Sequence, residues 1–442
     1  MGGGAMRRVA MLSLHTSPLA QPGTGDSGGM NVYVRELSSA LAEAGIETRV
    51  YVRRWSDDLD PVVEVEPGFR VVHVPAGPTG LAKEDLPAQV DAFTAGVRAD
   101  LDRFEPDVIH ANYWLSGVAG RQLKDQLGLP LVSTFHTLAR VKAEVGEPEP
   151  DIRVRAEAAI MAGSDVVVAN CTAEADELVN HYGVPRDRIE IVPPGVDHAL
   201  FSPGSQAGAR WALQTDDRPL LLFVGRIQPL KGVDVAVEAL AALRHRDARL
   251  WIVGGASGTG GGREVERVEK LIARHGLGGR VHFVAPRPHH LLGSYYRAAD
   301  VCLVPSRSES FGLVALEAAA CGVPTVASAV GGLTTLVDHG HTGYLVDGRD
   351  PVDYAAWVDT ILGDPVLARR LSISAAARGR TYTWSAAAAR LRRIYRDLTA
   401  PTIPTPTAAP SPAMVPTLRP GAAPAPVGDP DAPDHLPERS LP

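Results

Sequence analysis

Short runs of consecutive apolar residues alternate along the chain with longer stretches in which apolar residues recur at helical spacing. Strands that are apolar at nearly every position are typical of parallel sheets covered by helices on both faces. The pattern therefore predicts an α/β chain with two doubly wound sheets. The expected strands are 8–14, 48–52, 70–74, 107–113, 130–135 and 165–170 in one series, and 219–225, 249–255, 280–285, 301–305, 324–328 and 343–347 in the other.

Segment 192–219 separates the two series and is rich in Pro, Gly and polar residues. We interpret it as containing an interdomain linker. The expected domains are 1–200 and 219–399, the latter with the terminal helices, joined by a linker at 201–218. Since such sheets bind ligands at the carboxyl ends of their strands, the site is expected in the cleft between the domains. Segment 400–442 is rich in Pro and Ala and is expected to be disordered.

Composition narrows the class of protein. The chain has 442 residues, of which 45% are hydrophobic and 21% charged, and its net charge is −7. This charge argues against binding to nucleic acid through its phosphates. No apolar run is long enough to cross a membrane, and the first residues have no signal-peptide layout, so a cytoplasmic enzyme is expected. The cysteines, Cys171, Cys302 and Cys321, form no CxxC pair and are expected to be buried in the core.

Two glutamates in the segment SESFGLVALE carry the main chemical signal. Glu309 ends a loop after an apolar strand, and Glu317 lies about two turns into the helix that Phe311 and Gly312 open. A helix N-terminus with free N–H groups attracts anions, so the segment suits a ligand with hydroxyls at both ends and a phosphate between them. A nucleotide sugar has this chemistry. A solvated helix face is the alternative for an isolated pair of glutamates, but Arg226 and Lys231 in FVGRIQPLKG favour the functional interpretation.

Two glycine-rich segments resemble phosphate loops of other classes. In segment 15–37 the glycines do not form GxGxxG directly after the strand, and no acidic residue ends the next strand, so NAD binding is not expected. Segment 253–268 lacks GKS or GKT and is therefore no P-loop. We interpret it as a flexible surface connection.

Several polar residues of the first half suit a phosphate dianion. Lys, Tyr, Thr and Arg side chains together can clamp such a group, although spacing alone does not show that they meet. The candidates are Lys83, Tyr113, Thr137 and Arg153, with His136 beside Thr137.

Over residues 7–399 the sequence resembles the retaining glycosyltransferases of the GT-B fold, on the motifs GRIQPLKG and ESFGLVALE. The string HTSPLAQPGTGDSGGMNVY resembles those members that glycosylate inositol phosphate in the mycothiol pathway of actinobacteria, and it is shared more weakly by sucrose-phosphate synthases. The resemblance implies UDP-N-acetylglucosamine as donor, 1D-myo-inositol 3-phosphate as acceptor, retention at the anomeric carbon, no cofactor essential for the chemistry and a homodimer as one option.

The resemblance also implies residue roles. Arg226 and Lys231 would neutralise the diphosphate, Glu317 would bind the ribose, Glu309 the transferred sugar, and His136 would lie near the reaction centre. The remaining donor residues would be His15, Gln21, Pro22, Gly29, Val284 and Arg287. The acceptor residues would be Asp26, Ser27, Gly28, Gly29, Met30, Asn31, Lys83, Tyr113, Thr137 and Arg153, with Arg155 as a nearby rival of Arg153. A magnesium ion without a chemical role is implied near Tyr296, Arg297 and Ala299, held largely through main-chain oxygens.

The chain departs from the family pattern at Asn112, where a histidine is expected before the Tyr-Trp pair, and at Val323, where threonine is common. Three alternatives stay open. They are a related transferase with a sugar phosphate or phosphoinositide as acceptor, a UDP-sugar 2-epimerase, and a nucleotide-sugar-binding protein without turnover. The retention of both glutamates and both cations argues against the last.

Overall fold

The computed structural model describes residues 6–257 and 261–400, which form one compact unit. Its first sheet is built from β1 (Arg8–Leu12), β2 (Glu47–Arg53), β3 (Val62–Glu66), β4 (Phe69–Val74), β5 (Val108–Asn112), β6 (Leu131–Thr134), β7 (Val166–Ala169) and β8 (Ile189–Ile191). The helices between these strands are α1 (Gly29–Glu43), η1 (Lys83–Gln89), α2 (Val90–Phe104), α3 (Trp114–Leu127), α4 (Ala139–Glu144), α5 (Asp151–Gly163), α6 (Thr172–Tyr182) and η2 (Arg186–Arg188).

The second half repeats this plan. Its strands are β9 (Leu220–Val224), β10 (Arg249–Val253), β11 (Val281–Val284), β12 (Val301–Val304), β13 (Thr325–Ser328) and β14 (Gly343–Val346). Its helices are α7 (Gln206–Ala212), η3 (Pro229–Lys231), α8 (Val233–Ala242), α9 (Gly261–Arg274), η4 (His289–Leu291), α10 (Leu292–Ala298), α11 (Leu313–Ala320), α12 (Leu333–Leu336), α13 (Pro351–Gly363), α14 (Pro365–Gly379) and α15 (Trp384–Thr399).

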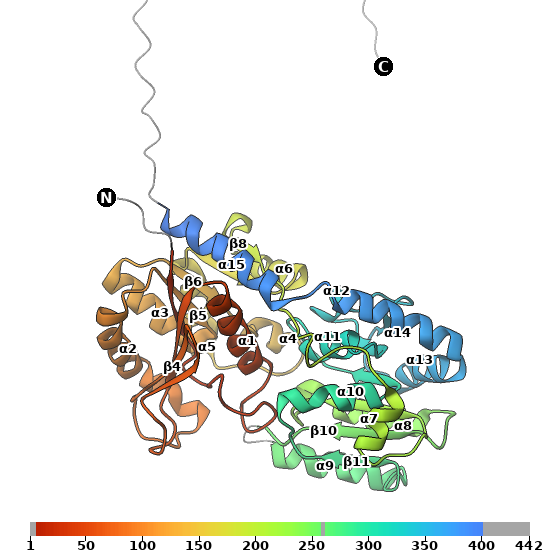
Figure 1. Cartoon of the computed structure of the whole chain (residues 1–442). Helices are drawn as coiled ribbons and strands as arrows, with labels where there is room; N and C mark the ends of the chain where they lie inside the picture. Colours follow the sequence, from red (N-terminus) through yellow and green to blue (C-terminus); the bar gives the residue numbers. More distant parts are fainter. Residues whose placement is uncertain (1–5, 258–260, 401–442) are drawn as a thin grey trace, which may run out of the picture. The chain divides into compact units, whose positions relative to one another are not determined.

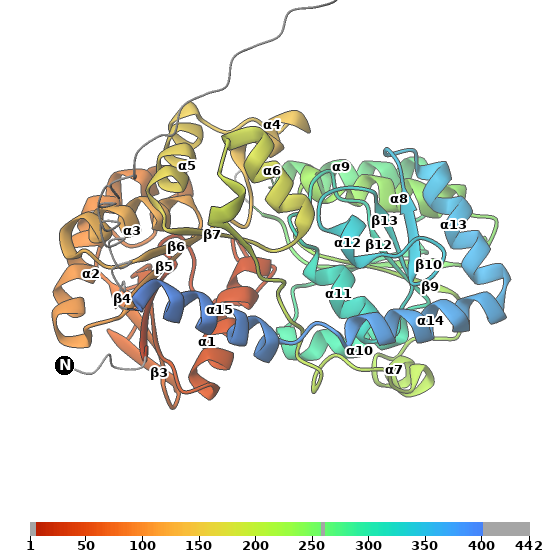
Figure 2. The same cartoon turned by 90° about the horizontal axis from the view of Figure 1, so that it is seen from above.

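Both sheets are doubly wound, as predicted (Figures 1 and 2). The strand order is β3-β4-β2-β1-β5-β6-β7-β8 in the first sheet and β11-β10-β9-β12-β13-β14 in the second. All neighbouring strands are parallel except the edge pair β3 and β4. The chain order reverses beside β1 and beside β9, so the loops after these strands lie at the switch points where ligands bind in such sheets. Every predicted strand is present, whereas β3 and β8 were not predicted.

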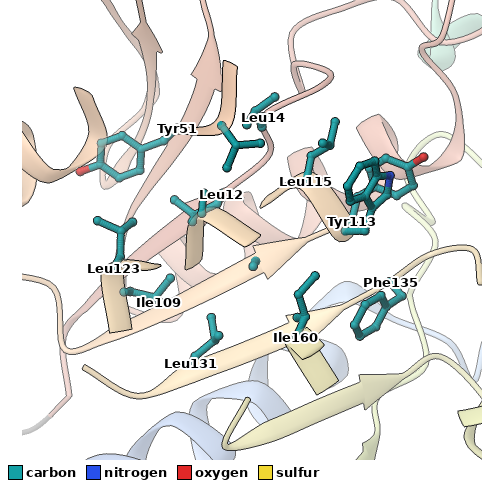
Figure 3. Close-up of a cluster of buried hydrophobic side chains, with 14 of the residues drawn as sticks. Leu12, Leu14, Tyr51, Ile109, Tyr113, Leu115, Leu123, Leu131, Phe135 and Ile160 are labelled. Atoms are coloured by element: carbon teal, nitrogen blue, oxygen red, sulfur yellow. The ribbon is translucent and has the colours of Figure 1, made fainter. Parts of the chain in front are cut away.

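The predicted apolar runs form the core. Leu12 of β1, Ile109 of β5 and Leu131 of β6 are fully buried and pack with side chains of α3 and α5 on one face of the first sheet (Figure 3). In the second sheet, Leu221 and Phe223 face one cluster while Leu222 faces another, as the alternation of a strand requires. Because both faces are covered, most positions of the central strands are apolar. The three cysteines are buried in the second of these clusters, as expected.

The final helix does not stay with the second sheet. Trp384, Leu391 and Tyr395 of α15 are buried against α1 and the first sheet, and α15 lies beside α1 in both views (Figures 1 and 2). This packing differs from the predicted grouping of the terminal helices with the second sheet. The short helix α7 also lies inside the segment predicted as a linker. Residues 401–442, predicted to be disordered, lie outside the described residues.

The helix starts follow their sequence signals. Asp350 and Asp364 are N-caps whose carboxylates accept hydrogen bonds from the next backbone N–H groups, and each precedes a proline at the first helical position. Helix α11 begins at Leu313 directly after Gly312, as the motif predicts. No helix in 6–257 or 261–400 has the length and apolarity that a membrane crossing requires.

Candidate active site

A cavity of about 1240 Å³ is lined by residues that follow strands of both sheets. From the first sheet come the loops after β1, β5 and β6, and from the second come the loops after β9, β10 and β12. Most of the predicted site residues line it, namely His15, Pro22, Asp26, Gly28, Gly29, Met30, Lys83, Tyr113, His136, Thr137, Arg153, Arg226, Lys231, Arg287, Glu309 and Glu317. The cavity is large enough for a nucleotide sugar together with a small acceptor.

Arg226 follows β9 and reaches toward the first sheet. Its Nη1 lies 3.1 Å from Ser257 Oγ, 3.4 Å from the Asp26 carbonyl oxygen and 3.9 Å from Asp26 Oδ1. Burial lowers the pKa of Arg226, which nevertheless stays charged at neutral pH because the ordinary value is far above it. A Cβ on Gly28 would lie 3.3 Å from Arg226 Nε, so glycine lets the two loops approach closely.

Lys231 and Glu309 form an ion pair between the loops that follow β9 and β12. Lys231 Nζ lies 2.6 Å from Glu309 Oε2, and Ser306 Oγ donates to the same oxygen at 3.3 Å. Both side chains are partly exposed to the cavity. An ammonium has three N–H donors, so Lys231 can hold Glu309 and still face an anionic ligand.

Glu317 is held at the bottom of the cavity by two donors. Tyr296 donates its hydroxyl to Glu317 Oε2 at 2.7 Å, and His289 Nε2–H donates to Oε1 at 2.8 Å. Burial opposes the charged imidazole, but the Glu317 carboxylate outweighs this effect and raises the pKa of His289. His289 was not among the predicted site residues.

Four polar side chains meet on the first-sheet wall, and we call them the phosphate cluster: Lys83, Tyr113, Thr137 and Arg153. Arg153 Nη2 donates to the carbonyl and hydroxyl oxygens of Thr137, both at 2.9 Å, and Nη1 donates to the Tyr113 hydroxyl at 3.2 Å. Lys83 Nζ and Arg153 Cζ lie 5.6 and 4.9 Å from the centre of the Tyr113 ring. Arg153 is 2% exposed, whereas Arg155 points to solvent.

His15 and Tyr113 pack against each other at the cavity wall, with ring centroids 4.2 Å apart and the ring planes tilted by 38°. Burial and the neighbouring Lys83 lower the pKa of His15, so the ring is neutral at pH 7. Its Nδ1 is buried and has no hydrogen-bond partner among the described residues. An unpaired buried ring nitrogen suits a ligand that supplies a donor or acceptor.

His136, two residues after the end of β6, adopts a left-handed backbone with φ of 63°. Its Nε2 lies 2.9 Å from Asn112 Oδ1, which can only accept, so Nε2 carries the proton. Burial lowers the pKa of His136 to about 3, and the ring is therefore neutral. Asn112, where the resemblance leads us to expect a histidine, lies within hydrogen-bond distance of this ring.

The loop between β1 and α1 brings some predicted residues to the cavity and leaves others behind it. Asn31 is buried: its Oδ1 accepts from Gly28 N–H at 2.8 Å, which caps α1. Ser27 is buried 3.4 Å from Thr16 Oγ1. Gln21 donates to the Pro286 carbonyl at 3.0 Å and joins the loops of the two halves. Asn31, Ser27, Gln21 and Val284 do not line the cavity and instead hold the residues that do.

The magnesium position implied by the resemblance has no free carboxylate beside it among the residues that the structure describes, so an ion there would be held by main-chain oxygens. Arg297 brings a guanidinium that donates to the carbonyl oxygens of Leu200 and Ser202. The Tyr296 hydroxyl already binds Glu317, and the Ala299 carbonyl accepts from Gln206. A divalent cation prefers free oxygen ligands, carboxylates above all. No group of three metal-ligating side chains occurs within the described parts of the chain.

Segment 253–268, predicted to be a surface connection, contributes to the cavity instead. Val253, Gly254 and Ser257 line it. A Cβ on Gly254 would lie 1.9 Å from the Gly225 carbonyl oxygen, so only glycine fits at this point. Sequence reasoning recognised that the segment is no P-loop but missed its position beside β9. Residues 258–260 of this segment lie outside the described residues.

Two features that shape the Glu309 loop were also missed. Ser310 Oγ donates to the His136 carbonyl oxygen at 2.6 Å, and the Ser310 carbonyl accepts from Cys171 Sγ at 3.3 Å. Gly331 and Gly332 press against the same loop, since a Cβ on Gly331 would lie 2.0 Å from the Glu309 carbonyl oxygen. The Gly331-Gly332 pair is evident in the sequence, but the sequence does not indicate which loop this pair contacts.

Comparison with known families matches both halves of the chain. The family "Glycosyltransferase Family 4" matches residues 27–200, and "Glycosyl transferases group 1" matches residues 208–379. Together they span most of the two sheets and the cavity between the strand ends.

Individual relatives cover most of the chain. A "D-inositol 3-phosphate glycosyltransferase" from Xylanimonas cellulosilytica is 50% identical over 407 residues, which are 89% of this chain and 97% of the relative. One of the same name from Geodermatophilus obscurus is 52% identical and covers 84% and 85%. Among solved structures, sucrose-phosphate synthase from Thermosynechococcus elongatus superposes with a TM-score of 0.84 at 36% identity, covering 89% and 99%.

Proposed function

The chain belongs to the D-inositol 3-phosphate glycosyltransferase family of GT-B glycosyltransferases, and we propose that it transfers N-acetylglucosamine from UDP-N-acetylglucosamine to 1D-myo-inositol 3-phosphate with retention. The observation that carries this proposal is the composition of the two cavity walls. Arg226, Lys231, Glu309 and Glu317 form one wall, and the phosphate cluster forms the other. A nucleotide sugar and a phosphorylated polyol have the complementary chemistry.

The donor wall suits the charge that develops during transfer. The bond between the anomeric carbon and the β-phosphate oxygen of UDP breaks, and the acceptor oxygen bonds to that carbon on the same face. The proton of the acceptor hydroxyl passes to the departing phosphate oxygen, so no protein base is needed. Arg226 and Lys231 stabilise the negative charge of the departing UDP, and fixed charges at such a position lower the barrier.

Polar groups around the sugar and the nucleoside orient the donor. Glu309 accepts hydroxyl protons of the sugar, and Glu317, fixed by Tyr296 and His289, accepts those of the ribose. Arg287, which lines the cavity, is proposed to meet the uracil, and Val284, at the end of the preceding strand β11, is proposed to support that loop from behind. Neutral His136 offers its Nδ1 lone pair, because Asn112 holds the proton on Nε2.

The phosphate cluster orients the acceptor. Its guanidinium and ammonium carry two positive charges, and two hydroxyls complete the set of donors. Charge-assisted hydrogen bonds to a phosphate dianion are the strong ones among those available in proteins. On this basis the product belongs to the first step of mycothiol biosynthesis. The cytoplasmic location and the homodimer stay predictions from the sequence.

A sugar phosphate is the second candidate acceptor. The observation that favours it is the 36% identity to a sucrose-phosphate synthase over 89% of this chain. The phosphate cluster alone does not separate an inositol phosphate from a sugar phosphate, so both acceptors belong in the assay.

The donor wall is tested by Lys231→Ala. Loss of one cation from the departing diphosphate is expected to lower kcat roughly a hundredfold or more, since each tenfold corresponds to about 1.4 kcal/mol. Lys270→Ala is the matched control, because Lys270 is exposed on α9 away from the cavity. Circular dichroism checks that both variants fold. Turnover of the Lys231 variant close to that of the control would contradict the assignment.

A further inference from the structure

One carboxylate lies among the cations of the phosphate cluster. Glu149 Oε1 forms an ion pair with Arg153 Nη1 at 2.9 Å and accepts a hydrogen bond from Lys142 Nζ. Burial alone would raise the pKa of Glu149, but the charges of Arg153, Lys142 and Lys83 outweigh it and lower the pKa. Glu149 is therefore ionised and faces the same cations that a phosphate would meet.

Arg153 has a second carboxylate partner, Glu157, which is held in place by the surrounding protein. Glu157 is fully buried, and its Oε1 lies 2.8 Å from Arg153 Nε. Its Oε2 also accepts from Ala139 N–H at 3.0 Å and from the Tyr182 hydroxyl. Glu157 thus fixes the guanidinium from behind. Glu149 has no such anchors, and its side chain is 21% exposed at the cavity.

We propose that Glu149 is an internal anion that occupies the phosphate position and is exchanged for the phosphate monoester of the acceptor. Lys142, released from Glu149 by this exchange, then becomes a further phosphate ligand. The inference rests on the proposed function for the class of acceptor. Glu149 leaves because a carboxylate and a phosphate dianion repel each other when both face Arg153.

The exchange needs only rotation of the Glu149 side chain. Glu149 lies between Pro148 and Pro150, which restrict the backbone on both sides. Gly146, with φ of 81°, makes the preceding turn after α4. A neutral polyol has no negative charge, so it cannot displace Glu149 from its ion pair with Arg153. The exchange therefore favours phosphorylated acceptors.

Binding of inorganic phosphate to the full-length chain tests the exchange directly by isothermal titration calorimetry. Glu149→Gln keeps the size of the side chain and removes its charge, so phosphate is expected to bind about tenfold more tightly. Lys142→Met removes a ligand and is expected to weaken binding about tenfold. Glu144→Gln is the matched control on the same segment, 63% exposed and away from the cavity.

If Glu149→Gln binds inorganic phosphate no more tightly than wild type does, the proposal is overturned. Glu149 would then merely position Arg153. Absence of phosphate binding in all four proteins would overturn it as well. Thermal denaturation confirms that each variant folds, and Lys142→Met tests the exchange independently of the Glu149 variant.

Steady-state kinetics separate this inference from the proposed function. With UDP-N-acetylglucosamine, Glu149→Gln is expected to lower the KM for 1D-myo-inositol 3-phosphate about tenfold, in line with the tighter binding of phosphate. If wild type makes no product from that acceptor while the variant binds inorganic phosphate more tightly, the acceptor identity fails and the exchange stands. An unchanged or higher KM with active wild type contradicts the exchange alone.

Discussion

Two neighbouring side chains orient the Glu317 carboxylate for the proposed binding of a ribose. Its two oxygens accept from Tyr296 and His289, and each oxygen keeps a lone pair for a ligand hydroxyl. Glu317 is 5% exposed, so an unpaired carboxylate there would be costly. The Glu317 carboxylate raises the pKa of His289, and a protonated His289 offsets part of that cost.

The raised pKa of His289 predicts a pH dependence of stability. The folded state holds this proton more tightly than the unfolded chain does. The stabilisation is therefore complete below about pH 6.5 and is lost as the pH rises through the higher folded value. Thermal denaturation of wild type and His289→Gln from pH 6 to 9 measures it. The difference in Tm is expected to shrink with rising pH.

Other buried groups titrate in this range as well, since burial raises the pKa of Glu174 and Glu177 to about 7. Both variants contain these glutamates, so their contribution cancels in the difference. A difference in Tm that is constant or grows above pH 6.5 would show that His289 is not charged in the folded protein.

At the scale of elements, the Glu309 loop is positioned by the turn before α12. Gly331 has φ of 45° and lies against the Glu309 carbonyl, while Gly332 N–H donates to that carbonyl at 2.9 Å. A side chain at this point meets backbone, which cannot move aside without moving Glu309. The GG pair therefore fixes the depth at which Glu309 enters the cavity.

Gly331→Ala tests this positioning. The loop is expected to shift, and a misplacement of the order of 1 Å lowers kcat/KM by roughly a hundredfold. Gly340→Ala is the matched control, because Gly340 also has a positive φ, of 79°, but has open space around its Cβ position. Both variants have the backbone strain of alanine in this region, and only the first has the clash. Equal kcat/KM in the two variants would contradict the role of Gly331.

Helix α15 ties the end of the described chain to the first sheet. The Tyr395 hydroxyl lies 2.5 Å from His110 Nδ1, and His110 Nε2 lies 2.8 Å from Thr134 Oγ1. All three residues are buried, and burial lowers the pKa of His110 to about 3. Thr134 ends β6 two residues before His136, so α15 supports the strand that carries a site residue.

Tyr395→Phe removes this support without changing the shape of the core. His110 Nδ1 is left without a partner, and the free energy of unfolding is expected to fall by about 1–3 kcal/mol. Tyr344→Phe is the control, since Tyr344 is also buried, stacks on Trp357, and has no hydrogen bond to its hydroxyl within residues 6–257 and 261–400. Urea denaturation measures both. A loss in the Tyr395 variant no larger than in the control would show that the hydrogen bond adds nothing.

At the scale of the whole molecule, the sequence predicts the repeated α/β plan because buried parallel strands are apolar at nearly every position. Edge strand β3 was missed because its sequence, VVEVE, is half polar, and β8 because it has three residues. The loop after β1 and the helix start at Gly312 were predicted correctly from glycine and strand-end signals. These features depend on local sequence alone.

The contacts between loops could not be predicted in the same way. Residues such as Ser310 and His136 are far apart in the sequence, and only the fold brings the loops after β12 and β6 together. The choice of Arg153 over Arg155 likewise depends on which face of α5 meets Thr137. Glu149 carried no signal, since its partners lie on other elements or a turn away.

On the proposed function, one wall of the cavity binds a UDP-sugar, the other binds a phosphorylated inositol, and the sugar is transferred between them. The most direct measurement incubates the purified protein with UDP-N-acetylglucosamine and 1D-myo-inositol 3-phosphate, and analyses the products by mass spectrometry and by the anomeric proton coupling in NMR. We predict N-acetylglucosaminyl-inositol phosphate and UDP, with the anomeric configuration of the donor retained. No product from this pair, together with product from a sugar phosphate, would contradict the assigned acceptor. An inverted product would contradict the mechanism.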